Sequence, residues 1–214
     1  ITVVANGIDP AFRPLPPEPV AAWRAARGLP ESFVLAVGTL QPRKNLGVLL
    51  EAWPLLRQAL GDQAPDLVIA GAPGWGDTDL GAQARRLGIV DAVRFPGFVP
   101  QEDLPFLYNA AAALALPSRY EGFGLPVAEA LACALPALVA EGSSLTEVAG
   151  DAALSAPPDQ PAAWAAGLAR LLRDAGLREH LKALGPGRAA GFRWERAAAE
   201  TAGVYGGVAG GSAP

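Results

Sequence analysis

The sequence of 214 residues is poor in the side chains on which many catalytic and structural sites depend. It has one cysteine, Cys133, and one histidine, His180, so it gives poor support for an internal disulfide, a zinc cluster or a catalytic triad. Cys133 lies in an apolar helical pattern, which predicts a small core residue. His180 lies in a polar helical pattern, which predicts a solvated side chain. We therefore expect the chemistry to come from carboxylates, cations and backbone groups.

Charge and long apolar runs are also scarce. Charged residues make up 18% of the chain, the net charge is −4 and the isoelectric point is about 5.1. Nucleic acids and anionic membranes attract basic surfaces, so neither is expected as the main partner. Glu129 and Pro136 interrupt the longest apolar run, so no transmembrane segment is predicted, and no signal peptide opens the chain. These features predict a soluble protein of the reducing cytoplasm.

Methionine is absent and lysine is rare. The chain does not begin with methionine, and it opens on "ITVV", which predicts a strand that ends at the turn Asn6-Gly7. We therefore expect the chain to be part of a longer protein. Of its seventeen basic residues only Lys44 and Lys182 are lysines. A lysine in a loop of such an arginine-rich chain suggests that its ammonium group has a specific role.

Short apolar runs alternate with helical patterns from residue 33 onwards, which is typical of strands buried on both faces and connected by helices. The pattern predicts an α/β fold with a Rossmann-like, doubly wound parallel sheet over residues 1–205 and a flexible tail over 206–214. The predicted strands are 33–40, 66–71, 92–97, 112–118 and 136–140, with 152–156 an edge strand or a loop. The predicted helices are 21–28, 45–60 with a kink at Pro54, 77–88, 100–110, 125–133, a short turn at 142–150, 160–174, 176–184 and 192–204.

Ligands of doubly wound sheets bind outside the carboxyl ends of the strands, so the loops that follow the strands are the candidate site. In the first loop, "VGTLQPRKN", Arg43 and Lys44 precede a helix for which Asn45 is the expected N-cap. Two cations at a helix N-terminus suit a phosphate or a diphosphate. Two ordinary surface bases are an equally good interpretation. The glycines of the second loop, 69–76, allow a close ligand approach but fit an ordinary loop better.

Two further loops are ambiguous in a similar way. The loop at Phe98 and Val99 could hold a flat nucleobase beside an apolar surface, or it could be a turn with Phe98 buried. In 140–150, Ser144 precedes Glu147 by three residues, which favours a capping box. The backbone amides of that segment also follow a strand, so a contact with phosphate is the alternative.

The stretch "SRYEGFGLPVAEAL" contains two glutamates, Glu121 and Glu129, with seven residues between them. Pro126 suits the first turn of the following helix, and the amides of 122–124 can then face ligand oxygens. Carboxylates accept hydrogen bonds from hydroxyl groups, so the pair suits a polyhydroxylated ligand. The alternative is that Glu121 stabilises the helix dipole while Glu129 is simply exposed. That alternative explains one glutamate but not the pair with its glycines.

Three segments together resemble a known family: "VLAVGTLQPRKNLGVLLEAW", "FPGFVPQEDLPFLYNAAAALALPSRYEGFGLPVAEALACALPALVA" and "SSLTEVAGDAAL". They resemble the C-terminal, donor-nucleotide-binding domain of retaining GT-B glycosyltransferases of family four, in a mannosyltransferase-like subgroup. The resemblance covers roughly residues 1–205, and "EGFGLPVAEA" is its most specific part. "ITVVANGIDPAFRP" resembles the junction between the two domains of that family. "FRWERAAAETAGVY" resembles the closing helix that crosses back to the N-terminal domain.

The resemblance implies that a bacterial enzyme transfers a sugar from a nucleotide diphosphate sugar, with GDP-mannose favoured, and retains the anomeric configuration. Glu121 would face the donor sugar, Lys44 helped by Arg43 would neutralise the leaving diphosphate without a metal ion, and Glu129 would bind the ribose hydroxyls. The implied catalytic residues are Glu121, Lys44 and Arg43. The implied donor-binding residues are Gly38, Thr39, Phe98, Val99, Gly122, Phe123, Gly124, Leu125, Glu129 and Ser144.

The resemblance also implies what this chain lacks. The acceptor-binding N-terminal domain is absent, so we expect weak donor binding and no turnover by this chain alone. Any peripheral contact with a membrane would involve that absent half. Thr39 stands where many family members have an arginine, and we expect Arg43 to compensate for it. The alternatives are a nucleotide-sugar epimerase of the same fold and a non-catalytic module that binds nucleotide sugars.

Overall fold

The computed structural model describes residues 1–76 and 79–210, the last two by their backbone alone. In these residues a parallel six-stranded sheet has the order β3-β2-β1-β4-β5-β6. The predicted doubly wound α/β fold is therefore confirmed, and the predicted stretch 152–156 contains an edge strand rather than a loop. The strands are β1 Phe33–Val37, β2 Asp66–Ala70, β3 Val93–Gly97, β4 Ala113–Leu116, β5 Ala137–Ala140 and β6 Leu154–Ala156.

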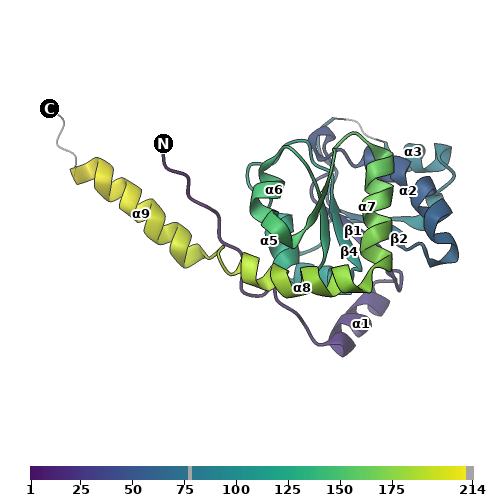
Figure 1. The fold of residues 1–214 in the computed structure, drawn as a ribbon, viewed down its shortest axis with the longest axis horizontal. Helices are drawn as coiled ribbons and strands as arrows, with labels where there is room; N and C mark the ends of the chain where they lie inside the picture. The colour runs from purple at the N-terminus through teal and green to yellow at the C-terminus, as the bar shows by residue number, and fades with distance from the viewer. Residues whose placement is uncertain (77–78, 211–214) are drawn as a thin grey trace.

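Helices cover both faces of the sheet. Figure 1 shows α5 and α6 on one side of the sheet and α2 and α7 on the other, and α8 packs on α5. Because both faces are covered, the central strands can be apolar throughout. The α-helices are α1 Pro17–Ala26, α2 Gly47–Leu60, α3 Leu80–Arg86, α4 Leu104–Ala110, α5 Leu125–Ala132, α6 Ser144–Ala149, α7 Pro161–Arg173, α8 Ala175–Ala189 and α9 Trp194–Gly210.

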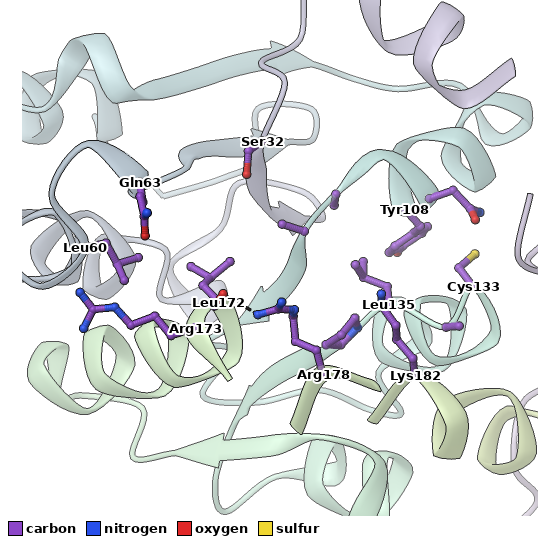
Figure 2. Close-up of a pocket in the computed structure, with 15 residues that line it drawn as sticks. Ser32, Leu60, Gln63, Tyr108, Cys133, Leu135, Leu172, Arg173, Arg178 and Lys182 are labelled. Atoms are coloured by element: carbon purple, nitrogen blue, oxygen red, sulfur yellow. Dashed lines mark hydrogen bonds between the residues drawn. The ribbon is translucent and has the colours of Figure 1, made fainter. Parts of the chain in front are cut away.

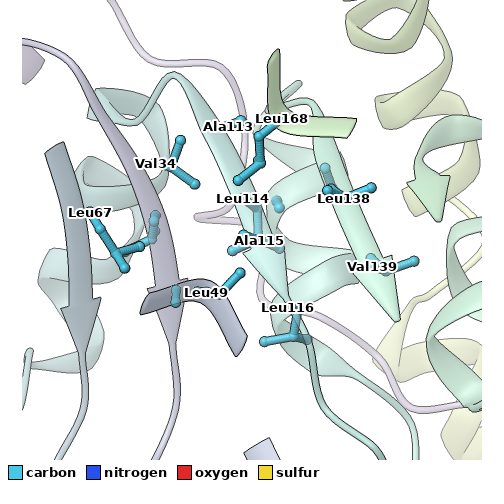
Figure 3. Packing of buried hydrophobic residues seen from close by; sticks show 14 of the residues in the cluster. Val34, Leu49, Leu67, Ala113, Leu114, Ala115, Leu116, Leu138, Val139 and Leu168 are labelled. Atoms are coloured by element: carbon cyan, nitrogen blue, oxygen red, sulfur yellow. The ribbon is translucent and has the colours of Figure 1, made fainter. Parts of the chain in front are cut away.

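The core lies between the sheet and these helices. Figure 3 shows Leu114 and Leu138 of the sheet with Leu49 of α2 and Leu168 of α7, and all four side chains are fully buried. The edge strand β3 is more exposed and contains Pro96, which is tolerated there because an edge strand leaves one row of N–H groups unpaired. The core thus fixes the carboxyl ends of the central strands, where the candidate loops begin.

The predicted strand at "ITVV" is wrong, because residues 1–9 have no strand pairing. Ile1 and Val3 are largely exposed. An apolar run becomes a strand only where a sheet edge is available to pair with it, and β3 and β6 are the edges of this sheet. The segment instead leaves the body of the domain on the same side as α9 (Figure 1).

The ends of several predicted helices also differ. The helix predicted at 176–184 continues through Pro186 to Ala189, because Leu181, Gly185 and Ala189 are buried at four-residue spacing and the helix packs on α5. The helix predicted at 192–204 extends further, since α9 continues to Gly210, and residues 211–214 lie outside the described residues. Each glycine of α9 lowers the stability of the helix by only about 1 kcal/mol. The first two residues predicted for the helix 77–88 also lie outside the described residues.

None of the described helices combines the length and the apolar character needed to cross a membrane.

Candidate functional site

The order of the strands places two candidate loops next to each other. β1 and β4 are neighbours in the sheet although β2 and β3 lie between them in the sequence. At such a switch point the chain leaves the two strands toward opposite faces, which opens a crevice at their carboxyl ends. The loop after β1 contains Arg43 and Lys44, and the loop after β4 contains Glu121. The backbone N–H of Arg119 donates to the carbonyl of Arg43 at 2.9 Å and ties the two loops together.

Three of the predicted residues form one ionic cluster in this crevice. Lys44 Nζ lies 2.5 Å from Glu121 Oε1, and Arg43 Nη1 lies 2.8 Å from Glu121 Oε2. The Ser118 hydroxyl donates to Glu121 Oε1 at 2.8 Å. Lys44 is 6% exposed, so its ammonium group is removed from bulk water. The cluster carries two positive charges and one negative charge.

The environment of Glu121 favours the ionised carboxylate. Burial acts to raise the pKa of Glu121, but the hydrogen bond and the charge of Lys44 act against it, as do the hydrogen bonds from Arg43 and Ser118. The pKa of Glu121 is therefore held below its ordinary value.

Local backbone geometry sets the position of the two cations. Arg43 and Lys44 lie in the short 3₁₀ turn Pro42–Lys44, and Asn45 follows it in the left-handed region with φ of 54°. Gly38 has φ of 136°, and a Cβ atom there would lie 3.0 Å from Lys44 Nζ, so glycine leaves the space that the ammonium group occupies.

The expectation that Asn45 caps the next helix is wrong. Leu46 is the N-cap of α2, and no side chain caps that helix end. The Asn45 side-chain amide instead donates to the carbonyl of Pro158 at 2.6 Å, in the loop before α7. The Asn45 amide therefore binds a residue distant in the sequence instead of capping the next helix. This contact fixes the end of the 3₁₀ turn that contains Arg43 and Lys44.

The capping box predicted from Ser144 and Glu147 is also wrong. Ser143 is the N-cap of α6, and its hydroxyl accepts from the N–H of Leu145 at 3.3 Å. Ser144 is the first residue of the helix, and its hydroxyl donates to the carbonyl of Glu121 at 2.9 Å. Ser144 therefore ties the loop of Glu121 to α6.

The backbone between Glu121 and α5 approaches α6 closely. Gly124 has φ of 106°, and a Cβ atom there would lie 2.6 Å from a methyl group of Leu145. Among the described residues, no protein group accepts a hydrogen bond from the N–H groups of 122–124. Pro126 lies in the first turn of α5, as predicted, and Leu125 begins the helix with 36% exposure. Three backbone donors thus remain available at this helix N-terminus.

Glu129 lies one turn further along α5 in a different environment. The Tyr108 hydroxyl of α4 donates to Glu129 Oε2 at 2.7 Å. Burial raises the pKa of Glu129, and the Tyr108 hydrogen bond lowers it by less. The alternative of a simply exposed Glu129 is wrong, because the side chain is half-buried and hydrogen-bonded.

The remaining predicted residues line two separate cavities. Gly38, Thr39, Phe98 and Val99 line a cavity of about 270 Å³. Phe98 is 72% exposed, so the interpretation of a buried Phe98 is wrong. A second cavity of about 370 Å³ is lined by Gly122, Phe123 and Ser144, together with the N-terminal segment. Glu129 lines neither of these two cavities.

A larger cavity of about 510 Å³ lies at the opposite, amino edge of the sheet (Figure 2). Three cations line it, but each already has a partner in the chain. Arg173 donates to the carbonyl of Ala59, Arg178 donates to the last carbonyls of α7, and Lys182 pairs with Glu179 at 2.9 Å. These bonds explain the three cations without a ligand.

Two contacts of the candidate glutamates were not predicted from the sequence, namely those of Ser118 and Tyr108. Ser118 is a buried polar residue three positions before Glu121, and this spacing is the only signal that could have revealed it. Cys133 is buried as predicted, and burial raises the pKa of its thiol to about 12. His180 is exposed as predicted. The described residues contain no group of three or more His, Cys, Asp or Glu side chains that could hold a metal ion.

Comparisons with known proteins identify the family. The model of the family "Glycosyl transferases group 1" matches residues 21–187, so the chain belongs to this family. It is 39% identical to O-antigen chain mannosyltransferase B of Escherichia coli, over 82% of this chain and 46% of the relative. It is also 39% identical to D-inositol 3-phosphate glycosyltransferase of Salinispora arenicola, over 96% of this chain and 49% of the relative.

The solved structures agree with this assignment at the level of fold. The crystal structure of the C-terminal domain of LpcC, a glycosyl transferase group 1 family protein of Francisella tularensis, matches with a TM-score of 0.73 at 21% identity. The match covers 86% of this chain and 97% of that domain. The fold is therefore that of the C-terminal half of GT-B glycosyltransferases. The chain spans about half the length of the curated relatives that it matches.

Proposed function

We propose that this chain binds the nucleotide-sugar donor of a retaining glycosyltransferase and stabilises the diphosphate that leaves during transfer. The observation that carries the proposal is the cluster of Lys44, Arg43 and Glu121 at the switch point of the sheet. These residues come from two loops: Glu121 lies 77 positions after Lys44 and 78 positions after Arg43 in the sequence.

The charge of the cluster suits an anionic leaving group. The cluster of Lys44, Arg43 and Glu121 has a net charge of +1, in a chain whose net charge is −4. In the absence of donor, Glu121 neutralises the buried ammonium group of Lys44. A diphosphate would compete for the same two cations and release the carboxylate to face the sugar. Fixed cations at the leaving group stabilise its developing charge, so the proposed reaction needs no metal ion.

The surrounding groups support a division of the donor between the two cavities and Glu129. The cavity beside Phe98 and Val99 would take the base, because an exposed aromatic ring and apolar neighbours suit a flat heterocycle. The N–H groups of 122–124 and Leu125 would bind oxygens of the sugar and the phosphates. Glu129 would accept hydrogen bonds from the ribose hydroxyls. Arg43 would supply the positive charge that Thr39 does not.

We propose mannose as the transferred sugar, and GDP-mannose is the first donor to test. The support is the 39% identity to an O-antigen chain mannosyltransferase. The chain is equally identical to a D-inositol 3-phosphate glycosyltransferase, whose name specifies no sugar, so other nucleotide sugars are tested beside GDP-mannose.

The acceptor would bind to a second half of the protein across the crevice. Trp194, Tyr205 and Val208 of α9 are largely exposed, and α9 projects from the body beside the N-terminal segment (Figure 1). We propose that this apolar helix packs against that second half, as the closing helix of the family does. The chain alone would then bind donor weakly and transfer no sugar, and any peripheral membrane contact in the cytoplasm would involve the other half.

An amide NMR titration tests the proposal. GDP, UDP and ADP, with their mannose and glucose derivatives, are added at up to millimolar concentration. We expect shifts confined to 43–45, 97–99 and 121–129, larger for one base than for the others. The two lysines supply a matched control, since Lys44→Ala should abolish the shifts and Lys182→Ala should leave them unchanged. A well-folded spectrum without localised shifts, or shifts that survive Lys44→Ala, would contradict the assigned donor site.

A further inference from the structure

Tyr108 joins two helices that both begin at the carboxyl edge of the sheet. It is the fifth residue of α4, and Glu129 is the fifth residue of α5. Both therefore lie about 6 Å along the axis from the first residue of their helices, and the Tyr108 hydroxyl donates to Glu129 Oε2 at 2.7 Å. The Tyr108 side chain is 0% exposed. Its ring packs edge-on against Phe12 and forms part of the wall of the 510 Å³ cavity (Figure 2).

The two glutamates differ in how fully their carboxylates are satisfied. Glu121 accepts hydrogen bonds from two cations and a hydroxyl. Glu129 accepts one side-chain hydrogen bond, from Tyr108, and has no cation within ion-pair distance among the described residues. A carboxylate has about four acceptor positions on its two oxygens. Glu129 therefore has one oxygen fixed by the protein and capacity left for the hydroxyls of a ligand.

Stability alone does not account for this pair. A buried phenol needs an acceptor, but a neutral amide or a backbone carbonyl would satisfy it. A half-buried carboxylate without a cation is a costly acceptor, because its ionised form loses hydration. The presence of Glu129 is therefore better explained by what the carboxylate does for a ligand than by what it does for Tyr108.

We propose that Tyr108 is a positioning residue that holds the Glu129 carboxylate in the orientation in which it binds the ribose hydroxyls of the donor. The inference rests on the proposed function, in which Glu129 faces the ribose. The hydroxyl fixes Oε2 and so limits the rotation of the carboxylate, which leaves Oε1 for the ligand. The same hydrogen bond favours the ionised form of Glu129, which is the better acceptor.

The test compares a nucleoside diphosphate with its 2′,3′-dideoxy analogue by isothermal titration calorimetry. Both ligands have the same base and diphosphate, so the ratio of their dissociation constants isolates the ribose hydroxyls. We expect wild type to prefer the ribonucleotide by about tenfold or more, the value of one hydrogen bond to a charged group. Tyr108→Phe should reduce this preference to less than about a third of the wild-type ratio. Glu129→Gln should reduce it at least as far.

Two variants separate positioning from packing. Phe12→Leu loosens the ring of Tyr108 but keeps its hydroxyl, so it should lower the unfolding temperature and keep the preference. Tyr205→Phe removes a phenol hydroxyl from exposed α9 and should change neither quantity. A further measurement needs no variant: the ¹³Cζ resonance of Tyr108 should move on addition of the ribonucleotide and stay in place with the dideoxy analogue.

The outcomes distinguish the inference from the function on which it rests. If Glu129→Gln abolishes the preference while Tyr108→Phe keeps it, Tyr108 is a structural residue only and the inference is wrong. If wild type binds both ligands equally, or Glu129→Gln changes nothing, the assignment of Glu129 to the ribose fails and the inference fails with it. A fall in preference in Tyr108→Phe, with Phe12→Leu unchanged, supports the positioning role.

Discussion

Replacing Glu121 with glutamine should destabilise the chain more than replacing Lys44 with methionine. Both side chains are almost fully buried, at 7% exposure for Lys44 and 9% for Glu121. Glu121→Gln leaves the ammonium group buried without a carboxylate, so we expect a loss of about 3 kcal/mol, the lower end of the range for breaking a buried pair. Lys44→Met leaves Glu121 bound to Arg43 and Ser118. We expect that variant to lose about 1.5 kcal/mol, the value of one hydrogen bond to a charged group.

The double variant distinguishes a direct ion pair from two independent effects. Lys44→Met with Glu121→Gln removes both buried charges, so its loss should resemble that of Lys44→Met alone. The coupling free energy should then be about 3 kcal/mol. Urea unfolding followed by far-ultraviolet circular dichroism gives each free energy of unfolding. In thermal unfolding, the loss in Glu121→Gln corresponds to a fall of about 6–12 °C for a domain of this size.

The chain contains a matched control for this measurement. Lys182 and Glu179 form a pair with exposures of 45% and 72%, so Glu179→Gln should change the free energy of unfolding by no more than about 0.5 kcal/mol. Equal losses in Glu121→Gln and Lys44→Met, or a coupling below about 0.5 kcal/mol, would refute the argument. Either result would mean that the two charges do not depend on each other in solution.

Three further predictions concern the same edge of the sheet. Phe98→Ala should weaken nucleotide binding about tenfold, as loss of a stacking ring does, with little change in unfolding temperature because the side chain is 72% exposed. Ser144→Ala should lower the free energy of unfolding by about 1 kcal/mol in urea unfolding, because it releases the loop of Glu121. In calorimetry it should weaken the binding of a nucleotide sugar more than the binding of the corresponding nucleoside diphosphate. Glu129→Gln should raise the free energy of unfolding at pH 7, since the pKa of Glu129 lies above its ordinary value of 4.5 and its ionisation costs the folded state stability as pH rises. Urea unfolding between pH 3.5 and 7 should show that gain vanish below about pH 4.5.

The sequence was sufficient to predict the sheet and the identity of the candidate loops. Buried runs such as 33–40 and 66–71 have a short-range signature, and the parallel order follows from their alternation with helices. The rule that ligands bind at strand ends then singled out Arg43, Lys44 and Glu121 before any contact between them was known. These three residues do meet in the folded chain.

The contacts that link these loops to the rest of the domain were not predictable in the same way. Asn45 binds the carbonyl of Pro158 across 113 positions, and Ser144 binds the carbonyl of Glu121 across 23. A short-range rule assigned Asn45 and Ser144 to helix caps, because capping statistics consider only the next three residues. The folded chain offered both side chains a distant carbonyl instead. Tyr108 lies in a helix that the sequence did predict. The periodicity of that helix shows which face is buried, but it does not show that this face packs against Glu129.

The contrast between the two glutamates matches the two chemically different ends of the proposed donor. Burial acts to raise the pKa of both carboxyl groups, and cations overcome that effect only at Glu121. In the proposed site, an anionic ligand group would therefore bind at the cluster of Lys44 and Arg43, where it would take the place of Glu121. A neutral hydroxyl gains at Glu129, where a carboxylate without a counter-charge needs donors. Inorganic diphosphate would satisfy only the first of these two sites, whereas a diphosphate joined to a ribose would satisfy both.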